Sequence, residues 1–124
     1  MKVSITESED DMLIEVPVEG PVFYAVENQA QPPIPRESFT KYFHKNAQYA
    51  KKNSPEETPV GTVFVKFVVT TDGSLVNFEI MKGINKELNL EAVRLIRNMP
   101  KWKPATQNGK VVNSSYVLPI AFRL

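Results

Sequence analysis

The side chains able to perform acid–base or nucleophilic chemistry are few in this sequence, and they are not matched to one another. His44 is the one histidine, with Lys41 and Lys45 beside it, and the chain has no cysteine. Asp72 precedes a glycine, a pair typical of tight turns, and Glu56-Glu57 falls in a polar loop. Because general acid–base catalysis needs titratable groups that the fold brings together, we predict a structural histidine and no enzymatic activity.

Metal and phosphate sites are also unsupported by the spacing of the residues. There is no His/Cys cluster and no alternating aspartate loop of the EF-hand kind, so neither zinc nor calcium is expected. The glycines are isolated from one another, which excludes a phosphate-cradling loop. Trp102 lies between Pro100 and Pro104, and we interpret it as a plug over one end of the core. No cofactor is expected.

Length, composition and charge set the class of protein. The chain has 124 residues and is 42% hydrophobic, which suits one domain with one core. Residues 1–35 carry seven acidic side chains against Lys2 alone, whereas the remainder is basic. This asymmetry favours anionic partners, but no aromatic-plus-basic motif of nucleic-acid readers is present. No stretch approaches the roughly 20 apolar residues of a membrane span, so we expect this chain to be soluble.

A predicted hairpin positions the rest of the chain. Residues 62–70 alternate, with valine and phenylalanine on one face and mixed residues on the other. Asp72-Gly73 reverses the direction, and residues 76–80 resume the alternation. The mixed face is too polar for burial on both sides. The hairpin is therefore expected in a small sheet with one covered face.

Two helices and a last strand complete the prediction. Phe39, Tyr42 and Phe43 share one face of a helix that follows Pro35. A second helix, capped by Asn85 or Asn89, ends at the prolines around Trp102. Residues 111–124 then alternate as a strand. Segment 21–26 is expected to lie extended on the domain, and we divide the chain into a leader or linker, residues 1–21, and a domain, residues 22–124.

These elements predict an α+β fold with a three-stranded mixed sheet packed against two helices. A right-handed crossover from the second hairpin strand returns the last strand parallel to it, so residues 62–70 take the middle position. Pro119 agrees with an edge position for the last strand, because proline lacks a backbone donor. The predicted core comprises Val63, Val65, Phe67, Val69, Val76, Phe78, Ile80, Leu88, Ala92, Leu95, Ile96, Met99, Leu118, Ile120 and Phe122.

Three motifs of this sequence occur together in one known family. They are the hairpin Gly61–Thr70 with Asp72-Gly73, the segment Met99-Pro-Lys-Trp-Lys-Pro104, and the closing pattern Tyr116-x-x-Pro-Ile-x-Phe122. Together they resemble the C-terminal domain of TonB proteins, particularly the Bacteroidetes-like branch. The likeness covers about half of the chain strongly and extends weakly to Phe39–Tyr49. The Tyr-Pro that commonly follows the family's first helix is Tyr49-Ala50 here.

The resemblance implies a non-enzymatic periplasmic coupling module. In such proteins an inner-membrane anchor and a proline-rich span precede this domain, and inner-membrane proton-channel proteins act through those regions. The domain itself binds the N-terminal peptide (TonB box) of an outer-membrane transporter by strand addition. On this chain the resemblance places the partner-binding strand at Ser114, Ser115, Tyr116, Val117, Leu118, Pro119, Ile120, Ala121, Phe122 and Arg123. Neighbouring Arg97, Lys101, Lys103, Lys110 and Arg123 are expected to attract an acidic peptide.

Two other functions stay open at this point. The domain is alternatively a recognition or regulatory appendage of a membrane sensor or peptidase, which an attached His-Glu-x-x-His helix would favour. A weaker alternative is an enzyme inhibitor, against which the absence of an exposed glycine-rich wedge argues. An unpaired strand edge can also self-associate, so a homodimer is open.

Overall fold

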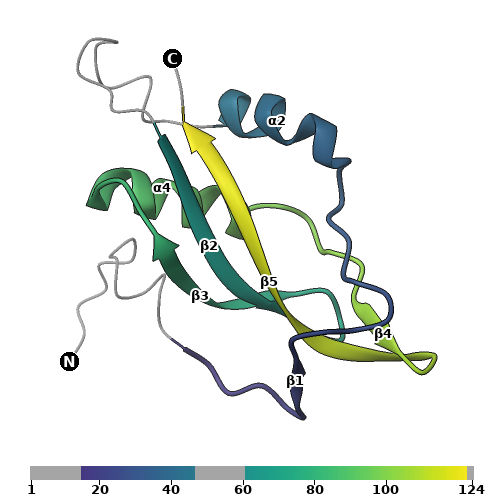
Figure 1. Ribbon diagram of the computed structural model, residues 1–124. Helices are drawn as coiled ribbons and strands as arrows, with labels where there is room; N and C mark the ends of the chain where they lie inside the picture. The colour runs from purple at the N-terminus through teal and green to yellow at the C-terminus, as the bar shows by residue number, and fades with distance from the viewer. Residues whose placement is uncertain (1–14, 47–60, 123–124) are drawn as a thin grey trace, which may run out of the picture.

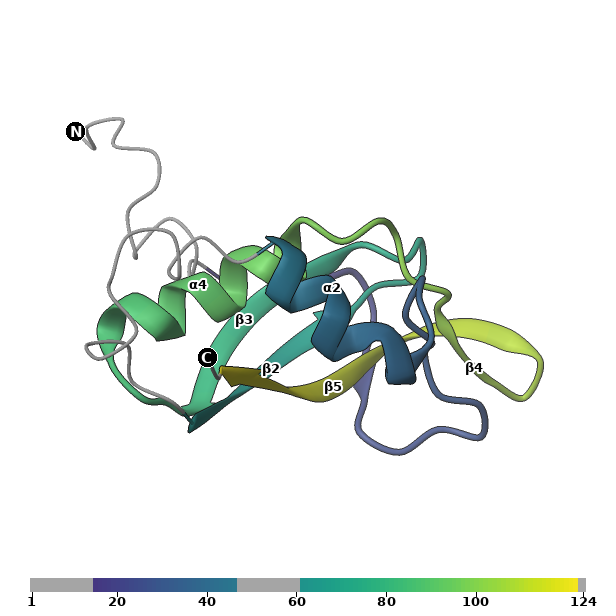
Figure 2. The ribbon, with the colours of Figure 1, turned by 90° about the horizontal axis from the view of Figure 1, so that it is seen from above.

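A sheet and a layer of helices make up the described part of the chain, residues 15–46 and 61–122 of this computed structural model (Figure 1). Its strands are β1 (Val22–Phe23), β2 (Gly61–Val69), β3 (Leu75–Lys82), β4 (Ala105–Gln107) and β5 (Lys110–Phe122). Its helices are α2 (Phe39–Asn46), which follows a 3₁₀ turn at Arg36–Ser38, and α4 (Lys86–Arg97). Figure 2 shows both helices on one face of the sheet, α4 over β2 and β3 and α2 over β5.

The order of the three long strands is β5-β2-β3, with β2 in the middle as predicted. β2 is antiparallel to both neighbours, and its register with β5 runs from Gly61 opposite Phe122 to Val69 opposite Ser114. β5 therefore runs parallel to β3, as the crossover argument requires. The predicted α+β class is confirmed. Two short strands join this sheet at β5: β1 pairs with it in parallel and β4 pairs with it as a hairpin.

β2 is buried on one face only, which confirms the prediction of a single covered face. Val63, Val65, Phe67 and Val69 are fully buried, whereas the residues between them are half-buried. Strands of this kind alternate because successive side chains point to opposite faces of the sheet. The helices cover the apolar face, and the mixed face with Lys66 has no helix over it in the described residues.

A bulge in β3 overturns the prediction that Val76 belongs to the core. Asn77 and Phe78 together lie opposite Phe67, since the flanking pairs are Lys66 with Glu79 and Val68 with Val76. An extra residue reverses the alternation on either side of it. Val76 consequently shares the open face with Val68, and Leu75 packs against the core instead.

Local capping explains where α4 begins and ends. The Asn85 side chain accepts a hydrogen bond from the Leu88 N–H at 2.8 Å, which is the N-cap interaction predicted for one of the two asparagines. The other asparagine, Asn89, accepts from the Ile84 N–H at 2.9 Å and so fixes the approach to the helix. Asn98 forms the C-cap.

The remaining predicted core residues are confirmed. Phe67 is its centre, with ring centroids 5.7 Å from Phe78, 5.4 Å from Trp102 and 5.8 Å from Tyr116. Trp102 is buried, as expected for a plug. Ile80 is partly buried and packs against this core. The sequence reasoning did not place the following residues in it: Ala30, Phe39, Phe43, Val93 and Ala105.

Residues 15–35, here called the N-terminal strap, run across the end of the sheet. At one end, the Asn77 side chain exchanges two hydrogen bonds with the backbone of Val16, at 2.6 and 3.0 Å. At the other end, Asn28 and Gln31 form single bridges with Thr106 and Lys103. The strap thus contacts the domain on both sides of the predicted boundary at residue 22, which stays a prediction.

Candidate functional site

The outer edge of β5 is divided into a paired half and an open half. β4 pairs with Lys110–Val112, and β1 pairs with Asn113 and Ser114. Over the next eight residues, Ser115 to Phe122, no strand of the described residues lies outside β5. We call this stretch the open β5 edge. A strand edge without a partner presents a row of backbone donors and acceptors.

This division corrects one end of the predicted partner-binding strand. Ser114 was expected at the free edge, but it pairs with Phe23. Ser114 is also 3% exposed, and its hydroxyl has no hydrogen-bond partner in the described part of the chain. Of the other predicted positions, Ser115 to Phe122 lie along the open β5 edge and Arg123 lies outside the described residues.

Pro119 indicates which backbone groups face outward. Val117 and Pro119 are exposed on the open face, whereas Leu118 and Ile120 are buried on the core face. Backbone groups alternate in the plane of the sheet with the same period as the side chains. Since proline has no N–H to give to β2, we infer that Pro119 faces outward, together with Val117 and Ala121. The open edge then offers donors on either side of the proline.

The strap forms a wall beside the open β5 edge, at the end next to the paired half of β5. A groove of about 230 Å³ lies between the strap residues Phe23, Tyr24, Val26, Gln29 and Ala30 and the β5 residues Ser114–Val117. A second groove, of about 640 Å³, is lined by residues 27–35 of the strap and by Tyr116. Peptide-binding edges often have pockets of this kind for alternate side chains.

Tyr24 is the most exposed large side chain in this region. It is 76% exposed, and the Lys66 ammonium lies 5.4 Å from the centre of its ring. Lys66 belongs to β2 and is opposite Val117 on β5. The ring and the lysine therefore border the open face of the sheet next to the open β5 edge, where a cation–π contact fixes the tyrosine without burying it.

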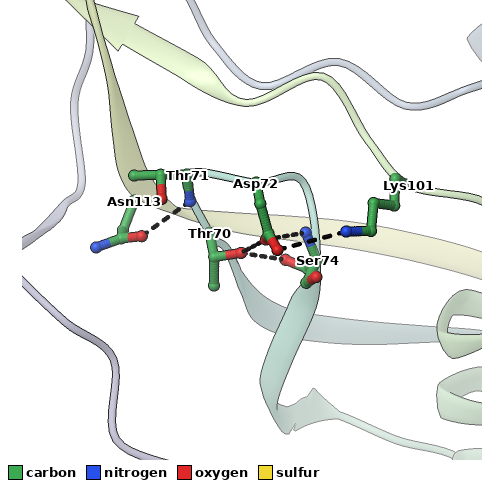
Figure 3. Close-up of polar contacts among 6 residues, drawn as sticks. All are labelled: Thr70, Thr71, Asp72, Ser74, Lys101 and Asn113. Atoms are coloured by element: carbon green, nitrogen blue, oxygen red, sulfur yellow. Dashed lines mark hydrogen bonds and ion pairs between the residues drawn. The ribbon is translucent and has the colours of Figure 1, made fainter.

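Asn113 holds the paired half of β5 in place. Its side-chain N–H₂ donates to the carbonyls of Glu19 and Pro21, at 2.9 and 3.2 Å. Its side-chain oxygen accepts from the Thr71 N–H at 3.1 Å (Figure 3). The residue is only 4% exposed. One buried amide thus joins the strap, β5 and the turn between β2 and β3, and these bonds satisfy a side chain that packing removes from water.

The β2–β3 turn is stabilised by Asp72. Its carboxylate accepts from the Thr70 hydroxyl and the Ser74 N–H, and Lys101 lies 3.4 Å away (Figure 3). The hydrogen bond from Thr70, followed by those from Ser74, holds the pKa of Asp72 well below its usual range. Asp72 is therefore a turn residue, as its sequence context predicts.

Four of the five predicted basic neighbours of the peptide site do not line the open β5 edge, and the fifth, Arg123, lies outside the described residues. Lys101 pairs with Asp72, and Arg97 lines a groove beside Gly73 at the same end of the sheet. Lys103 bridges to the strap, and Lys110 lies in the β4–β5 hairpin. The segment around Trp102 runs from the end of α4 to the β2–β3 turn. These cations therefore lie at the end of the sheet where β5 is already paired. Lys66, opposite Val117 in the neighbouring strand, is a base that does border the open edge.

Residues 15–46 and 61–122 contain no candidate metal centre. Within these ranges there is no group of three or more His, Asp or Glu side chains able to hold a metal ion. The described helices are also too short and too polar to cross a membrane. What the described surface offers chemically is backbone hydrogen bonding along a strand edge.

The sequence reasoning missed two features of the site. β1 gave only the signal of an extended segment, because two residues are too few for a periodic pattern. Asn77 and Asn113 carried no signal as anchors, since their partners lie 61 and 42 or more residues away. A lone asparagine inside a strand, where this residue is unfavourable, is the clue that could have marked both positions.

The chain is similar to one protein family and to a solved structure. A sequence model of the family described as Gram-negative bacterial TonB protein C-terminal matches residues 45–124. Among solved structures, the NMR solution structure of Helicobacter pylori TonB-CTD (residues 179–285) is similar, with 22% sequence identity and a TM-score of 0.49 over 75% of this chain and 86% of that chain. Among curated proteins, none matches.

Proposed function

This chain belongs to the TonB C-terminal family, and on that premise we propose that it is a non-enzymatic, periplasmic coupling module that binds the N-terminal peptide of an outer-membrane transporter. The peptide adds as a strand to the open β5 edge. Its backbone supplies the affinity, and side chains that alternate between the two faces supply the specificity. Binding then connects the transporter to the energy-coupling protein of which this domain is a part.

One observation carries this proposal: the outer side of β5 from Ser115 to Phe122 has no partner strand in the described residues, although β1 occupies the same side one residue earlier. An added peptide continues the line that β1 begins. It displaces no strand of the described residues. The side chains of β5 that face the core already pack there, so the partner needs no rearrangement of the core.

The grooves beside the strap support the same site. A strand on the open β5 edge passes the groove of about 230 Å³, which has walls from both the strap and β5 residues Ser114–Val117. On the open face of the sheet the peptide meets Val117, Pro119 and the Tyr24–Lys66 contact. Lys66 lies opposite Val117 beside this path, so an acidic side chain on that face of the peptide is favoured.

Peptide titration with the full chain tests the proposal. Synthetic peptides from the N-termini of TonB-dependent transporters are added to isotope-labelled protein, with a scrambled peptide as control. We expect amide shifts along Ser115–Phe122 and at the strap residues of the groove. Shifts confined to residues 71–81, with Ser115–Phe122 unchanged, would overturn the site even though the fold is correct.

Proline substitutions add a second readout. Val117→Pro and Ala121→Pro each remove one outward donor, so we expect weaker peptide binding with little change in the melting temperature. Val117→Ala keeps the donor and serves as the matched control. Ile120→Pro removes a donor that faces β2 and is expected to destabilise the sheet instead. Loss of stability in the Val117 and Ala121 variants, rather than loss of affinity, would show that the inferred direction of the edge is wrong.

A further inference from the structure

Cations that the sequence suggested near the last strand lie instead around a groove at the end of the sheet where β2 turns into β3. This groove has a volume of about 310 Å³ and runs between the β2–β3 turn and the segment that follows α4. Its lining residues come from both walls: Gly73, Ser74, Leu75, Arg97, Met99, Pro100 and Lys101. None of them belongs to the open β5 edge, so the groove is a separate feature of the surface.

The two walls of the groove are joined by backbone contacts. The Trp102 N–H donates to the Gly73 carbonyl at 3.0 Å. Gly73 has φ 87°, and a Cβ at this position would collide with the Trp102 carbonyl oxygen. The turn can therefore lie against the segment only because this residue is glycine. The groove is formed without a ligand, as binding sites usually are.

Positive charge surrounds this groove. Arg97 is exposed and has no ion-pair partner in the part of the chain that the structure describes. Lys101 lies 3.4 Å from Asp72, but the two side chains are 67% and 64% exposed, and such surface pairs contribute little (Figure 3). Lys103 is also exposed, two residues beyond Lys101, with the buried Trp102 between them. Asp72 does not balance these three cations, so a negatively charged ligand is favoured.

The lining of the groove also includes apolar side chains. Leu75 is partly buried and packs against the core, Met99 is buried, and Pro100 is exposed. A ligand that carries charge alone leaves this surface in contact with water. An apolar group next to a carboxylate removes part of it from water and gains free energy by doing so. The groove therefore fits a ligand that combines both kinds of group.

The segment after α4 gives the groove a means to bind a polypeptide. Lys101 lies outside every strand, and neither its N–H nor its C=O has a backbone partner in the described residues. Extended peptides recognise other chains through backbone groups of this kind, with alternate side chains in neighbouring pockets. A small anion uses the cations but not these groups. The combination of charge, apolar lining and available backbone thus favours a peptide.

We propose that this groove is a second interaction site, occupied by an acidic segment of a partner protein in which an apolar side chain lies next to aspartate or glutamate. The apolar side chain packs on Leu75 and Met99. The carboxylates bind Arg97 and Lys101, and the planar guanidinium of the arginine suits a bidentate contact. This site shares no residue with the open β5 edge, so the inference does not depend on what binds there, and both sites can be occupied at once.

A titration with a short acidic peptide tests the site. The probe is a capped pentapeptide with a leucine between two glutamates, added to the isotope-labelled full chain. We expect amide shifts at residues 73–75 and 97–101, with an affinity that falls as salt rises. The same peptide with glutamines in place of the glutamates is expected to bind at least about tenfold more weakly, because the charge-assisted contacts are lost.

Variants of the chain provide the matched comparison. Arg97→Gln/Lys101→Gln is expected to lower the affinity for the acidic peptide at least about tenfold. Lys41→Gln/Lys82→Gln removes the same charge at exposed positions outside the groove and should bind like the wild type. Asp72→Asn removes the carboxylate that competes for Lys101 while keeping an acceptor for the turn, so the affinity should rise about two- to fivefold. The amide spectra of the free variants report whether the fold is intact.

Three outcomes would overturn the proposal. The first is that the peptide leaves the amides of the groove unshifted, or that both double variants bind it equally. The second is that inorganic phosphate shifts the same amides as strongly as the peptide, which would leave an unspecific anion site. The third is that vesicles containing anionic lipid shift these amides and the peptide does not, which would assign the cations to a membrane surface. Binding of transporter peptides at Ser115–Phe122 should be unchanged in Arg97→Gln/Lys101→Gln, so the two sites are tested separately.

Discussion

β3 and β5 flank the same central strand, yet they are built in opposite ways. β5 keeps an unbroken register of nine residue pairs with β2, whereas β3 carries a bulge at Asn77 and Phe78 and a second irregularity near Met81. Bulges and charged side chains discourage edge-to-edge pairing with other chains. Glu79 and Lys82 are exposed on β3, while the open half of β5 carries no charge from Ser115 to Phe122. The β3 edge thus carries features that discourage pairing with another chain, whereas the open β5 edge does not.

Under the proposed function, this contrast teaches that the position of the binding edge is decided by interruptions in β3 as much as by β5 itself. A regular β3 would offer two equivalent sites for an incoming peptide. Pro119 limits β5 to a peptide partner that tolerates one missing donor, which also reduces association of β5 with itself. The four predictions below probe this contrast, beginning with the support that both edges share.

Phe67→Ala should abolish the difference between the edges by weakening both. The ring contacts Phe78 in β3, Tyr116 in β5 and Trp102 after α4. Truncating a fully buried phenylalanine costs about 3–5 kcal/mol, measured as the free energy of unfolding in urea. Phe64→Ala on the half-buried face is the control and is expected to cost less. A loss below about 1 kcal/mol for Phe67→Ala would show that the core is assigned to the wrong residues.

Asn113→Ala should affect the β5 side alone. It removes the bonds to Thr71, Glu19 and Pro21, all made in a buried position, so we expect a loss of about 1–3 kcal/mol. Asn113→Asp keeps the acceptor for Thr71 and loses both donors to the strap. Amide exchange should therefore rise at β1 in both variants, but at the β2–β3 turn only in the alanine variant. An equal rise in amide exchange along β3 would contradict the expectation that Asn113 anchors only the β5 side of the sheet.

Tyr24→Ser should lower the affinity of the open β5 edge for a peptide without lowering the stability of the domain, so it separates binding from folding. The ring is exposed and contributes a surface cation–π contact with Lys66, a type of contact worth about 0.5–1 kcal/mol. We expect peptide binding at the open β5 edge to weaken about two- to fivefold, measured by titration calorimetry. Tyr24→Phe keeps the ring and should bind like the wild type. Unchanged binding of Tyr24→Ser would remove this residue from the site.

Asp72→Asn should have the smallest effect, and at neither edge. The hydrogen bonds from Thr70 and Ser74 lower the pKa of Asp72, so the carboxylate stabilises the fold at pH above its unfolded pKa of about 3.9. This stabilisation is lost as the pH falls through the lowered pKa of the folded state. A small difference in melting temperature between wild type and Asp72→Asn is thus expected at pH 7 and should vanish in strong acid. A difference that grows in acid would reverse the sign of the argument.

The sequence was sufficient to predict the three long strands, both helices and the strand order. Alternation in β2, the Asp72-Gly73 turn and the prolines around Trp102 are local signals, and each of them agrees with the tertiary structure. The prediction that Val76 lies in the core was wrong because a bulge changes the face of every residue on one side of it. A bulge has no dependable signature in a single sequence. An asparagine in the middle of the strand was the sole trace of it.

The candidate site was predictable in outline but not at its closed end. Pro119 and the crossover indicated an edge, yet the pairing of Ser114 with Phe23 depends on a two-residue strand about 90 residues earlier in the chain. The cations were misplaced for the same reason. Distance along the sequence suggested that Lys101 and Lys103 lie near the last strand, whereas the Trp102 loop carries them to the hairpin turn and the strap.

β5 also determines when this domain can fold. β1, β2 and β4 all pair with β5, and Gly61 meets its partner, Phe122, about 60 residues later in the sequence. During synthesis, β2 and β3 can form their hairpin early, but one side of β2 stays unpaired until β5 has been made. Contacts between distant residues slow folding, because a long loop must close before they contribute. The sheet is therefore completed after translation of its last strand, and the newly made β2 edge is the surface that needs protection until then.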